Sequence, residues 1–257
     1  MTTILELKGL TKRFGGLTAL SDVDLRAQAG QITGLIGPNG AGKTTCFNLI
    51  TGTLPATAGQ VIFKGEDTTG LQPHKLVARG LARTFQSATT FPNASVRENI
   101  LRSALLRHSV GPLQTLFGGA AARRAEAAAA TTVDEAMEAL DLTEHADRLA
   151  GTLAYGHQKR LGVAIGLATR PDLLLLDEPA AGLNPEEVDR FAMILGTLRQ
   201  RFGLSILIVE HHMRLIMRVC DHIVVLDHGE KIAEGTPPEM QNDPKVIAAY
   251  LGAEHVA

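Results

Sequence analysis

The chain has 257 residues, of which 45% are hydrophobic and 20% charged, and its formal net charge is −2. A chain of this length buries a substantial core and suits one large domain, or one domain with an inserted lobe. The near-neutral charge argues against a nucleic-acid partner, because proteins that bind nucleic acids usually present a basic surface.

Neither a membrane span nor a secretion signal is evident in the sequence. The apolar runs at residues 173–176 and 204–209 are far shorter than the about 20 residues of a membrane-spanning helix. The N-terminus has neither the basic start nor the apolar stretch of a signal peptide. Cys46 and Cys220 suit free, partly buried thiols in a reducing compartment. We therefore expect the chain to stay in the cytoplasm, held by other subunits if it works at a membrane.

The first third of the chain predicts short strands around a glycine-rich loop. Apolar runs bounded by turn residues predict strands at residues 4–7, 23–25, 32–36 and 61–63. Residues 12–16 close the first run. A glycine-rich segment at residues 37–42 leads from the third run into a helix expected over residues 44–50.

From about Pro92 the pattern becomes helical. Ser95 and Glu98 have the spacing of a capping box, which predicts a helix start at this point. The apolar residues expected on the inner face of this helix are Val96, Ile100, Ala104 and Leu105. The alanine-rich residues 120–140 predict a second helix. The expected division of the chain is a core of residues 1–87 and 161–237, an inserted helical lobe of residues 88–160, and a C-terminal helical tail of residues 238–257.

In the second half, acidic and histidine residues follow two apolar strands. Four consecutive leucines at residues 173–176 predict a strand buried on both faces, and Asp177-Glu178 end it. A second buried strand over residues 205–209 ends at Glu210-His211-His212. The remaining predicted elements are a helix over residues 186–201 and a hairpin turn at residues 227–230. Strands that alternate with helices predict an α/β fold with a mixed, largely parallel sheet, in which ligands bind at the carboxyl ends of strands.

Residues 37–45 match the phosphate-binding pattern GxxxxGK[ST] in full. In order they are Gly37, Pro38, Asn39, Gly40, Ala41, Gly42, Lys43, Thr44 and Thr45. Glycines let the backbone fold tightly enough for successive N–H groups to face a phosphate, and the following helix adds the positive end of its dipole. Lys43 suits the β- and γ-phosphates, and the Thr44 hydroxyl suits Mg²⁺. Because the motif follows a predicted strand and precedes a predicted helix, we interpret it as a nucleotide-phosphate site.

The polar residues after the two buried strands suit ATP hydrolysis. Asp177 is placed to hold Mg²⁺ through water, and Glu178 to act as the general base that polarises the attacking water. His211 suits a hydrogen bond to the γ-phosphate. The alternatives are a solvated acidic turn and a structural histidine. A metal site at His211-His212 is disfavoured, because no HExxH pattern or cysteine partner accompanies the pair.

With these residues in place, the chain closely resembles the ABC ATPases, a family of P-loop NTPases, over nearly its whole length. Residues 83–86 look like the Q-loop of that family, which implies that Gln86 lies near Mg²⁺ and the attacking water. Residues 180–184 resemble the D-loop. Phe14 stands where the family stacks an aromatic ring on adenine, whereas without the resemblance it would be taken for a core residue.

The place of the family's signature motif, usually Leu-Ser-Gly-Gly-Gln, carries a departure. Leu153 is followed by the predicted nucleotide-binding residues Ala154, Tyr155, Gly156, His157 and Gln158. Ala154 replaces the serine whose hydroxyl meets the γ-phosphate of an ATP held by the opposite subunit, and Tyr155 replaces a glycine. Backbone N–H groups at the helix start remain able to bind phosphate.

The departure narrows the resemblance to the ATP-binding subunits of bacterial branched-chain amino-acid importers. Residues 177–184, 210–213 and 243–252 are similar to that group as well. The resemblance implies ATP and Mg²⁺ as cofactors, and as partners transmembrane permease subunits, a second ATPase subunit (identical or homologous) and, indirectly, a solute-binding protein. It implies a place on the cytoplasmic face of the inner membrane. Urea or amide importers, and a soluble ABC ATPase outside transport, are the alternatives.

Overall fold

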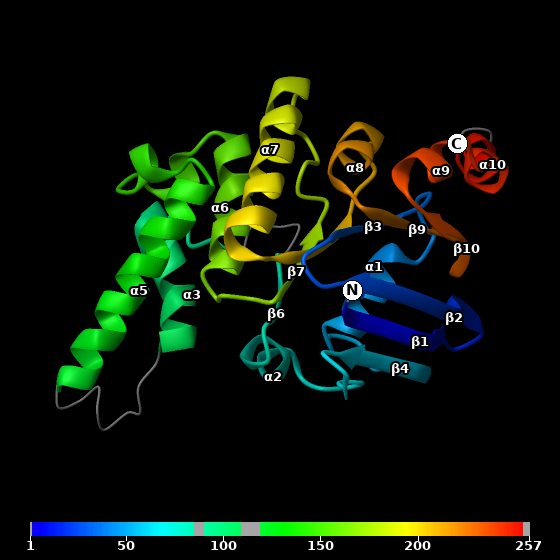
Figure 1. The fold of residues 1–257 in the computed structure, drawn as a ribbon, viewed down its shortest axis with the longest axis horizontal. Coiled ribbons are helices and arrows are strands. Elements are labelled where there is room, and N and C mark those ends of the chain that lie inside the picture. The colour runs from blue at the N-terminus through cyan, green and yellow to red at the C-terminus, as the bar shows by residue number, and fades with distance from the viewer. Residues whose placement is uncertain (1, 85–89, 109–118, 254–257) are drawn as a thin grey trace.

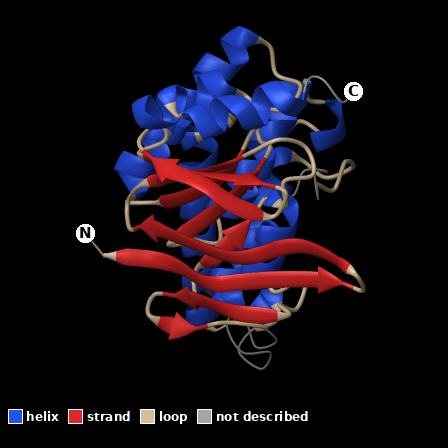
Figure 2. Ribbon diagram, turned by 90° about the vertical axis from the view of Figure 1, so that its right-hand side faces the viewer, coloured by secondary structure: helices blue, strands red, loops and turns tan. Residues whose placement is uncertain are grey.

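The computed structural model describes residues 2–84, 90–108 and 119–253. Within these ranges the strands form two sheets, seen as separate layers in Figure 2. An antiparallel sheet has the order β2-β1-β4-β5, and a six-stranded sheet has the order β10-β9-β3-β8-β7-β6, parallel except for β10. The strands are β1 (Thr3–Phe14), β2 (Leu17–Gln28), β3 (Ile32–Ile36), β4 (Ala58–Phe63), β5 (Glu66–Asp67), β6 (Leu81–Arg83), β7 (Leu173–Asp177), β8 (Ser205–Val209), β9 (His222–Asp227) and β10 (Glu230–Gly235).

Helices lie on both faces of the parallel sheet: α1 (Lys43–Ile50) and α2 (Pro73–Ala78) pack into the core shared with the antiparallel sheet, and most of the others cover the opposite face and extend beyond it (Figure 1). The others are α3 (Val96–His108), α5 (Ala120–Ala139), the 3-10 turns η1 (Thr143–His145) and η2 (Ala150–Thr152), α6 (Tyr155–Leu167), α7 (Pro185–Phe202), α8 (Met213–Val219), α9 (Pro237–Asn242) and α10 (Pro244–Ala253). The helices predicted over residues 44–50, 120–140 and 186–201 are confirmed. Among the described residues, no helix is both long enough and apolar enough to cross a membrane.

The parallel sheet separates two hydrophobic cores, which explains its unbroken apolar strands. Side chains alternate between the faces of a strand. Leu173 and Leu175 of β7 therefore join the core shared with α1 and the antiparallel sheet, and Leu174 and Leu176 join the core beneath the helices. The predicted fold, a mixed and largely parallel sheet, is confirmed, and the separate antiparallel sheet is an addition to it.

The helical lobe begins as predicted, with one error. The capping box is present: the Ser95 N–H donates to Glu98 Oε2 (2.7 Å), and the Glu98 N–H donates to Ser95 Oγ (3.1 Å). Of the four apolar residues expected on the inner face of α3, three are buried, but Leu105 is 40% exposed. Leu105 is nine residues after Val96, and at about 100° per residue this places it on the opposite side of the helix.

The first strand is longer than predicted. β1 continues through Phe14, which pairs with Leu17, so that only Gly15 and Gly16 form the turn. Ladder hydrogen bonds come from the backbone and do not require apolar side chains, so the polar residues 12–13 did not end the strand. The hairpin predicted at residues 227–230 is confirmed, with positive φ angles at His228 (46°) and Gly229 (84°), as a tight hairpin turn requires.

The lobe and the C-terminal segment lie on different parts of the core. In Figure 1, α3, α5 and α6 gather at one end of the molecule, whereas α9 and α10 lie beside β9 and β10 at the other. The predicted boundary at residue 160 falls inside α6. The division into domains stays a prediction. Cys46 and Cys220 are free thiols, and both are buried.

Candidate functional site

The glycine-rich loop between β3 and α1 packs so closely against neighbouring backbone that two of its glycines have no room for a side chain. A Cβ atom on Gly37 would lie 2.1 Å from the Leu226 carbonyl oxygen, and one on Gly42 would lie 2.7 Å from the Ala19 carbonyl oxygen. Gly42 also has a φ of 98°, in the region that favours glycine. The glycines at these two positions are therefore required by close backbone approach.

Lys43, the first residue of α1, is held against this loop. Its Nζ donates to the carbonyl oxygens of Gly37 and Pro38, both at 2.8 Å, and the residue is 8% exposed. Burial lowers the pKa of Lys43, and the carboxylates of Glu178 and Asp177 partly offset this shift. The loop thus presents a partly desolvated cation close to two acids.

A small cavity lies over this loop. Its volume is about 220 Å³, and it is lined by Ala19, Asn39, Gly40, Ala41, Gly42, Lys43, Thr44, Thr45 and Glu178. The structure therefore brings Glu178 to the phosphate motif, although Glu178 lies 133 positions after Thr45 in the sequence. The approach follows from the sheet order, because β7 and β3 both lie beside β8.

The segment after β7, residues 177–180, is called the acidic turn below. Asp177 is 5% exposed and forms an ion pair with Arg83 (Nη2 to Oδ2, 2.6 Å). Arg83 also donates to Asn48 Oδ1 of α1 at 2.7 Å. The sequence placed Arg83 only within the Q-loop resemblance and did not reveal this pairing, since burial of both charges depends on the neighbouring strands β6 and β7.

The segment after β8, residues 210–212, is called the histidine turn below. The side chain of His211 is 53% exposed. Glu210 is fully buried, and it accepts hydrogen bonds from the backbone N–H groups of Ala180 (2.7 Å), His211 (3.0 Å) and His212 (3.1 Å). This role of Glu210 was not predicted from the sequence, because its partners are backbone N–H groups, which every residue except proline carries.

The signature residues 154–158 begin α6. Ala154 is the N-cap, has no side-chain capping bond, and accepts the N–H groups of His157 and Gln158 at its carbonyl oxygen (2.9 and 3.1 Å). The Gln158 side chain donates to the Leu153 carbonyl oxygen at 2.9 Å. A Cβ on Gly156 would lie 2.5 Å from Glu187 Oε1, so a side chain at this position would displace that carboxylate.

Tyr155, which departs from the family pattern, packs against the D-loop of its own chain. A Cβ on Gly182 would lie 2.9 Å from the Tyr155 ring. Lys159, one turn further along α6, lies 5.4 Å from the centre of that ring and donates to the Glu178 carbonyl oxygen at 3.3 Å. The tyrosine thus joins α6 to the segment that carries Glu178.

The other predicted site residues are more dispersed. Phe14 is 46% exposed at the end of β1, with Lys12 Nζ 5.0 Å from its ring centre, so it is not a core residue. Gln86 lies outside the described residues. Within the described part of the chain, neither Phe14 nor residues 154–158 line the cavity over the glycine-rich loop.

Comparison with known proteins identifies the family. Residues 20–181 match the ABC transporter family model, and residues 230–256 match a model described as branched-chain amino acid ATP-binding cassette transporter. The chain belongs to the ABC transporter family of ATP-binding subunits. It is 45% identical to the high-affinity branched-chain amino acid transport ATP-binding protein BraF of Pseudomonas aeruginosa, over 97% of this chain and 98% of BraF. It is 41% identical to LivG of Escherichia coli, which carries the same description, with the same coverage.

The structural comparison agrees. The crystal structure of the ADP conformation of MJ1267, an ATP-binding cassette of an ABC transporter, superposes with a TM-score of 0.84 at 33% identity, covering 98% of this chain and 100% of that one. The resemblance drawn from the motifs is therefore confirmed, and so is ATP hydrolysis as the activity of this ABC ATPase. Members of the family bind ATP, and they power transport together with transmembrane subunits.

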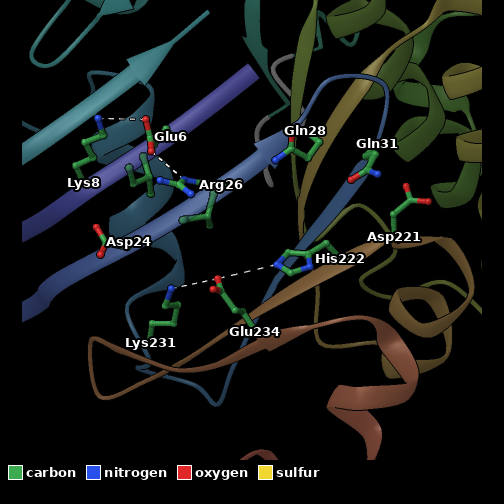
Figure 3. Close-up of a pocket in the computed structure, with 12 residues that line it drawn as sticks. Glu6, Lys8, Asp24, Arg26, Gln28, Gln31, Asp221, His222, Lys231 and Glu234 are labelled. Atoms are coloured by element: carbon green, nitrogen blue, oxygen red, sulfur yellow. Dashed lines mark hydrogen bonds and ion pairs between the residues drawn. The ribbon is translucent and has the colours of Figure 1, made fainter. Parts of the chain in front are cut away.

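A larger cavity in the ABC ATPase lies apart from these motifs. It measures about 750 Å³ and is bounded by β1, β2 and β9–β10 (Figure 3). Charged side chains pair along its walls: Glu6 of β1 with Arg26 of β2 (2.9 Å), and Glu234 with Lys231 within β10 (3.1 Å). None of the predicted site residues lines it. The smaller cavity over the phosphate loop is therefore the candidate nucleotide site. Among the described residues, no group of three or more His, Cys, Asp or Glu side chains is placed to hold a metal ion.

Proposed function

We propose that this chain is the ATP-hydrolysing subunit of an importer for branched-chain amino acids, placed on the cytoplasmic face of the inner membrane. The observation that carries the proposal is the match of residues 230–256 to the branched-chain model, because the cassette at residues 20–181 is shared by ABC ATPases generally. BraF and LivG, whose names state this transport, agree over nearly the whole chain. The solute itself is expected to bind to other subunits.

The nucleotide is held by the phosphate loop and the exposed Phe14 ring. Backbone N–H groups of residues 37–45 and the Lys43 amine bind the phosphates, and Phe14 stacks on adenine. Three observations support this proposal. A side chain at Gly37 or Gly42 would collide with neighbouring backbone, the Lys43 cation is buried, and the Phe14 ring is 46% exposed. The partner subunit completes the site with its own signature segment.

The site residues also fit Mg²⁺, which prefers oxygen ligands. The Thr44 hydroxyl, the Gln86 amide and the Asp177 carboxylate would hold the ion, with Asp177 acting through water. The Asp177 carboxylate is a suitable oxygen ligand, and Arg83 balances its buried charge. When bound, the ion neutralises charge on the phosphates.

Hydrolysis uses two further side chains. Glu178 acts as the general base toward the attacking water, supported by its place in the wall of the phosphate-loop cavity. His211 donates a hydrogen bond to the γ-phosphate, where charge grows in the transition state. Both follow neighbouring parallel strands, β7 and β8, so one edge of the sheet carries both groups.

The proposed transporter needs two kinds of partner subunit. A second ATPase subunit, identical or homologous, packs head to tail, so that residues 154–158 of one subunit cover the phosphate loop of the other. The 52% exposure of Tyr155 supports this arrangement. Cytoplasmic helices of the permease dock in a groove of about 160 Å³ between the core and the lobe, whose lining includes Arg83 and Thr84, the described part of the predicted Q-loop. Its walls are Val77, Ala82, Arg83, Thr84, Ser103, Leu106, Gly162, Ile165, Gly166 and Thr169.

The proposal is tested by recovering a tagged copy from detergent-solubilised native membranes and identifying its partners by mass spectrometry. We expect two hydrophobic permease chains, a second ATPase chain if the pair is a heterodimer, and a solute-binding protein specific for branched-chain amino acids encoded or recovered with them. A permease complex that transports urea or amides would correct the solute. Recovery only with ribosomal or nucleic-acid-bound partners would overturn the transport role.

A further inference from the structure

We infer that Glu210 is a positioning residue, whose buried carboxylate holds the acidic turn and the histidine turn at a set spacing during hydrolysis. This inference rests on the proposed roles of Glu178 and His211. It assigns to Glu210 no contact with nucleotide. Its effect passes through the backbone of the two turns.

The two turns leave the sheet side by side. β7 and β8 are parallel neighbours, with Asp177 opposite Val209. The Glu178 N–H donates to the Val209 carbonyl oxygen at 2.9 Å, which continues the pairing by one residue. Beyond this bond the sheet ladder ends, and the Glu210 carboxylate takes over the connection.

One carboxylate bridges both turns. Oε1 accepts the Ala180 N–H of the acidic turn (2.7 Å), and Oε2 accepts the N–H groups of His211 and His212 (3.0 and 3.1 Å). Glu210 and Ala180 are both 0% exposed. Hydrogen bonds from N–H groups to an ionised acceptor are stronger than neutral ones, and they weaken least where water is excluded. The bridge thus links the two turns through three hydrogen bonds to one fully buried carboxylate.

Both groups that this link is proposed to position depend on their local backbone. The His211 side chain is 53% exposed, so packing does not set its position and its own backbone must. Glu178 has a φ of 45°, a conformation that non-glycine residues adopt only when their surroundings enforce it. Glu210 supplies that support to both residues through one side chain.

Two substitutions separate the parts of the bridge. Glu210→Gln keeps the shape but turns an NH₂ group toward backbone donors. Glu210→Asp keeps the charge and is one methylene shorter. An aspartate readily accepts the N–H two residues later, so we expect it to keep the His212 contact and lose the Ala180 contact. Thr33→Val is the matched control: Thr33 is equally buried on the next strand, β3, and its hydroxyl has no hydrogen-bond partner among the described residues.

The experiment measures kcat, KM, ATP affinity and melting temperature for these variants, alone and combined with His211→Ala, which leaves the residue 211 N–H in place. We expect Glu210→Asp and Glu210→Gln to lower kcat by about 10- to 100-fold, as for a displaced catalytic group, with ATP affinity unchanged. The double variant with His211→Ala should be slower than His211→Ala alone but faster than the product of the two single losses, because the two changes share the contribution of the histidine turn and only Glu210 also supports the acidic turn. Thr33→Val should keep the wild-type kcat.

Several outcomes would overturn the inference: wild-type kcat in both Glu210 variants, a double variant whose losses multiply, or a loss of ATP affinity that parallels the loss of kcat. Failure of both Glu210 variants to fold would assign Glu210 to the fold alone. The roles proposed for Glu178 and His211 are tested separately by Glu178→Gln and His211→Ala. If these two retain activity, the proposed chemistry fails; if they lose it and the Glu210 variants do not, only the positioning role fails.

Discussion

The phosphate loop and the signature segment are both proposed to bind phosphate, yet they differ in how closely they keep the family pattern. The loop matches its pattern at every position, and Gly37 and Gly42 have backbone oxygens 2.1 and 2.7 Å from where a Cβ would stand. Set against Leu-Ser-Gly-Gly-Gln, the signature segment has lost its serine, one glycine and, at His157, the final glutamine. Ala154 and Tyr155 are exposed, whereas the retained Gly156 is buried.

The difference teaches which parts of a phosphate site depend on the backbone. Where the chain must wrap closely around a ligand, a side chain has no room and glycine is required. Where the contact comes from N–H groups at a helix start, side chains that point outward are free to change. Tyr155, one of the changed side chains, packs on Gly182 in its own chain.

The largest expected effect lies on the phosphate-loop side. Glu178→Gln should leave ATP binding intact and lower steady-state turnover by at least about 100-fold, the usual contribution of a general base. Phosphate release and nucleotide titration measure the two quantities. Glu186→Gln, an exposed acid in the first turn of α7, is the control and should keep wild-type turnover. Retained turnover in Glu178→Gln would remove Glu178 from the role of base.

A smaller effect is expected on affinity. Lys43→Ala should weaken nucleotide binding by about 10- to 100-fold, because it removes hydrogen bonds from a charged donor. Lys231→Ala is the matched control, since Lys231 lies in the wall of the larger cavity of Figure 3. A fluorescent-nucleotide titration compares the two. Weaker binding in Lys231→Ala alone would place the nucleotide in the larger cavity instead.

Much of the fold was predictable because its signals are local. Four leucines in a row indicate a strand buried on both faces, and the Ser95–Glu98 spacing marks a helix start. β6 and α2 were not predicted, since three and six residues are too short to show a period. The antiparallel sheet was missed as a separate layer, because strand patterns do not reveal which strands pair.

For the site, the sequence named the residues of one contiguous motif and the polar ends of two strands. It did not reveal the Arg83–Asp177 ion pair, which joins residues 94 positions apart on neighbouring strands. It also missed Glu210, whose bonds are made to backbone N–H groups and leave no mark on the residue types around it. Long-range pairing and backbone contacts are the parts that a single sequence conceals.

For the signature segment, the quantity to measure is thermal stability. Ala154 is the N-cap of α6 without a side-chain bond. Ala154→Ser should therefore stabilise the isolated chain by about 1 kcal/mol and raise Tm by about 2–4 °C. Ala127→Ser, an exposed alanine inside α5, should lower Tm slightly, because serine is the poorer residue in a helix interior. Thermal unfolding that showed no difference in sign between the two variants would contradict an open cap at Ala154.

The smallest effect concerns pH and His157, the exchanged last position of the signature. Burial lowers the pKa of His157, and the nearby charges of Arg160, His145, Arg190 and Arg148 lower it further. The unfolded chain, with a histidine pKa of about 6.5, therefore binds protons at a higher pH than the folded chain does. Stability is full above that pKa and falls as the pH drops below it, since unfolding then takes up a proton.

His157→Gln removes this proton uptake but keeps a residue that the family itself uses at this position. The wild-type chain should therefore lose more Tm than His157→Gln between about pH 7.5 and pH 5.5, on either side of the free histidine pKa. Melting curves of both proteins at the two pH values give the answer, because all other titrating groups cancel in the difference. An equal loss of Tm in both proteins would mean that His157 is as easily protonated in the folded chain as in the unfolded chain. Burial and the nearby charges of Arg160, His145, Arg190 and Arg148 would then not lower its pKa.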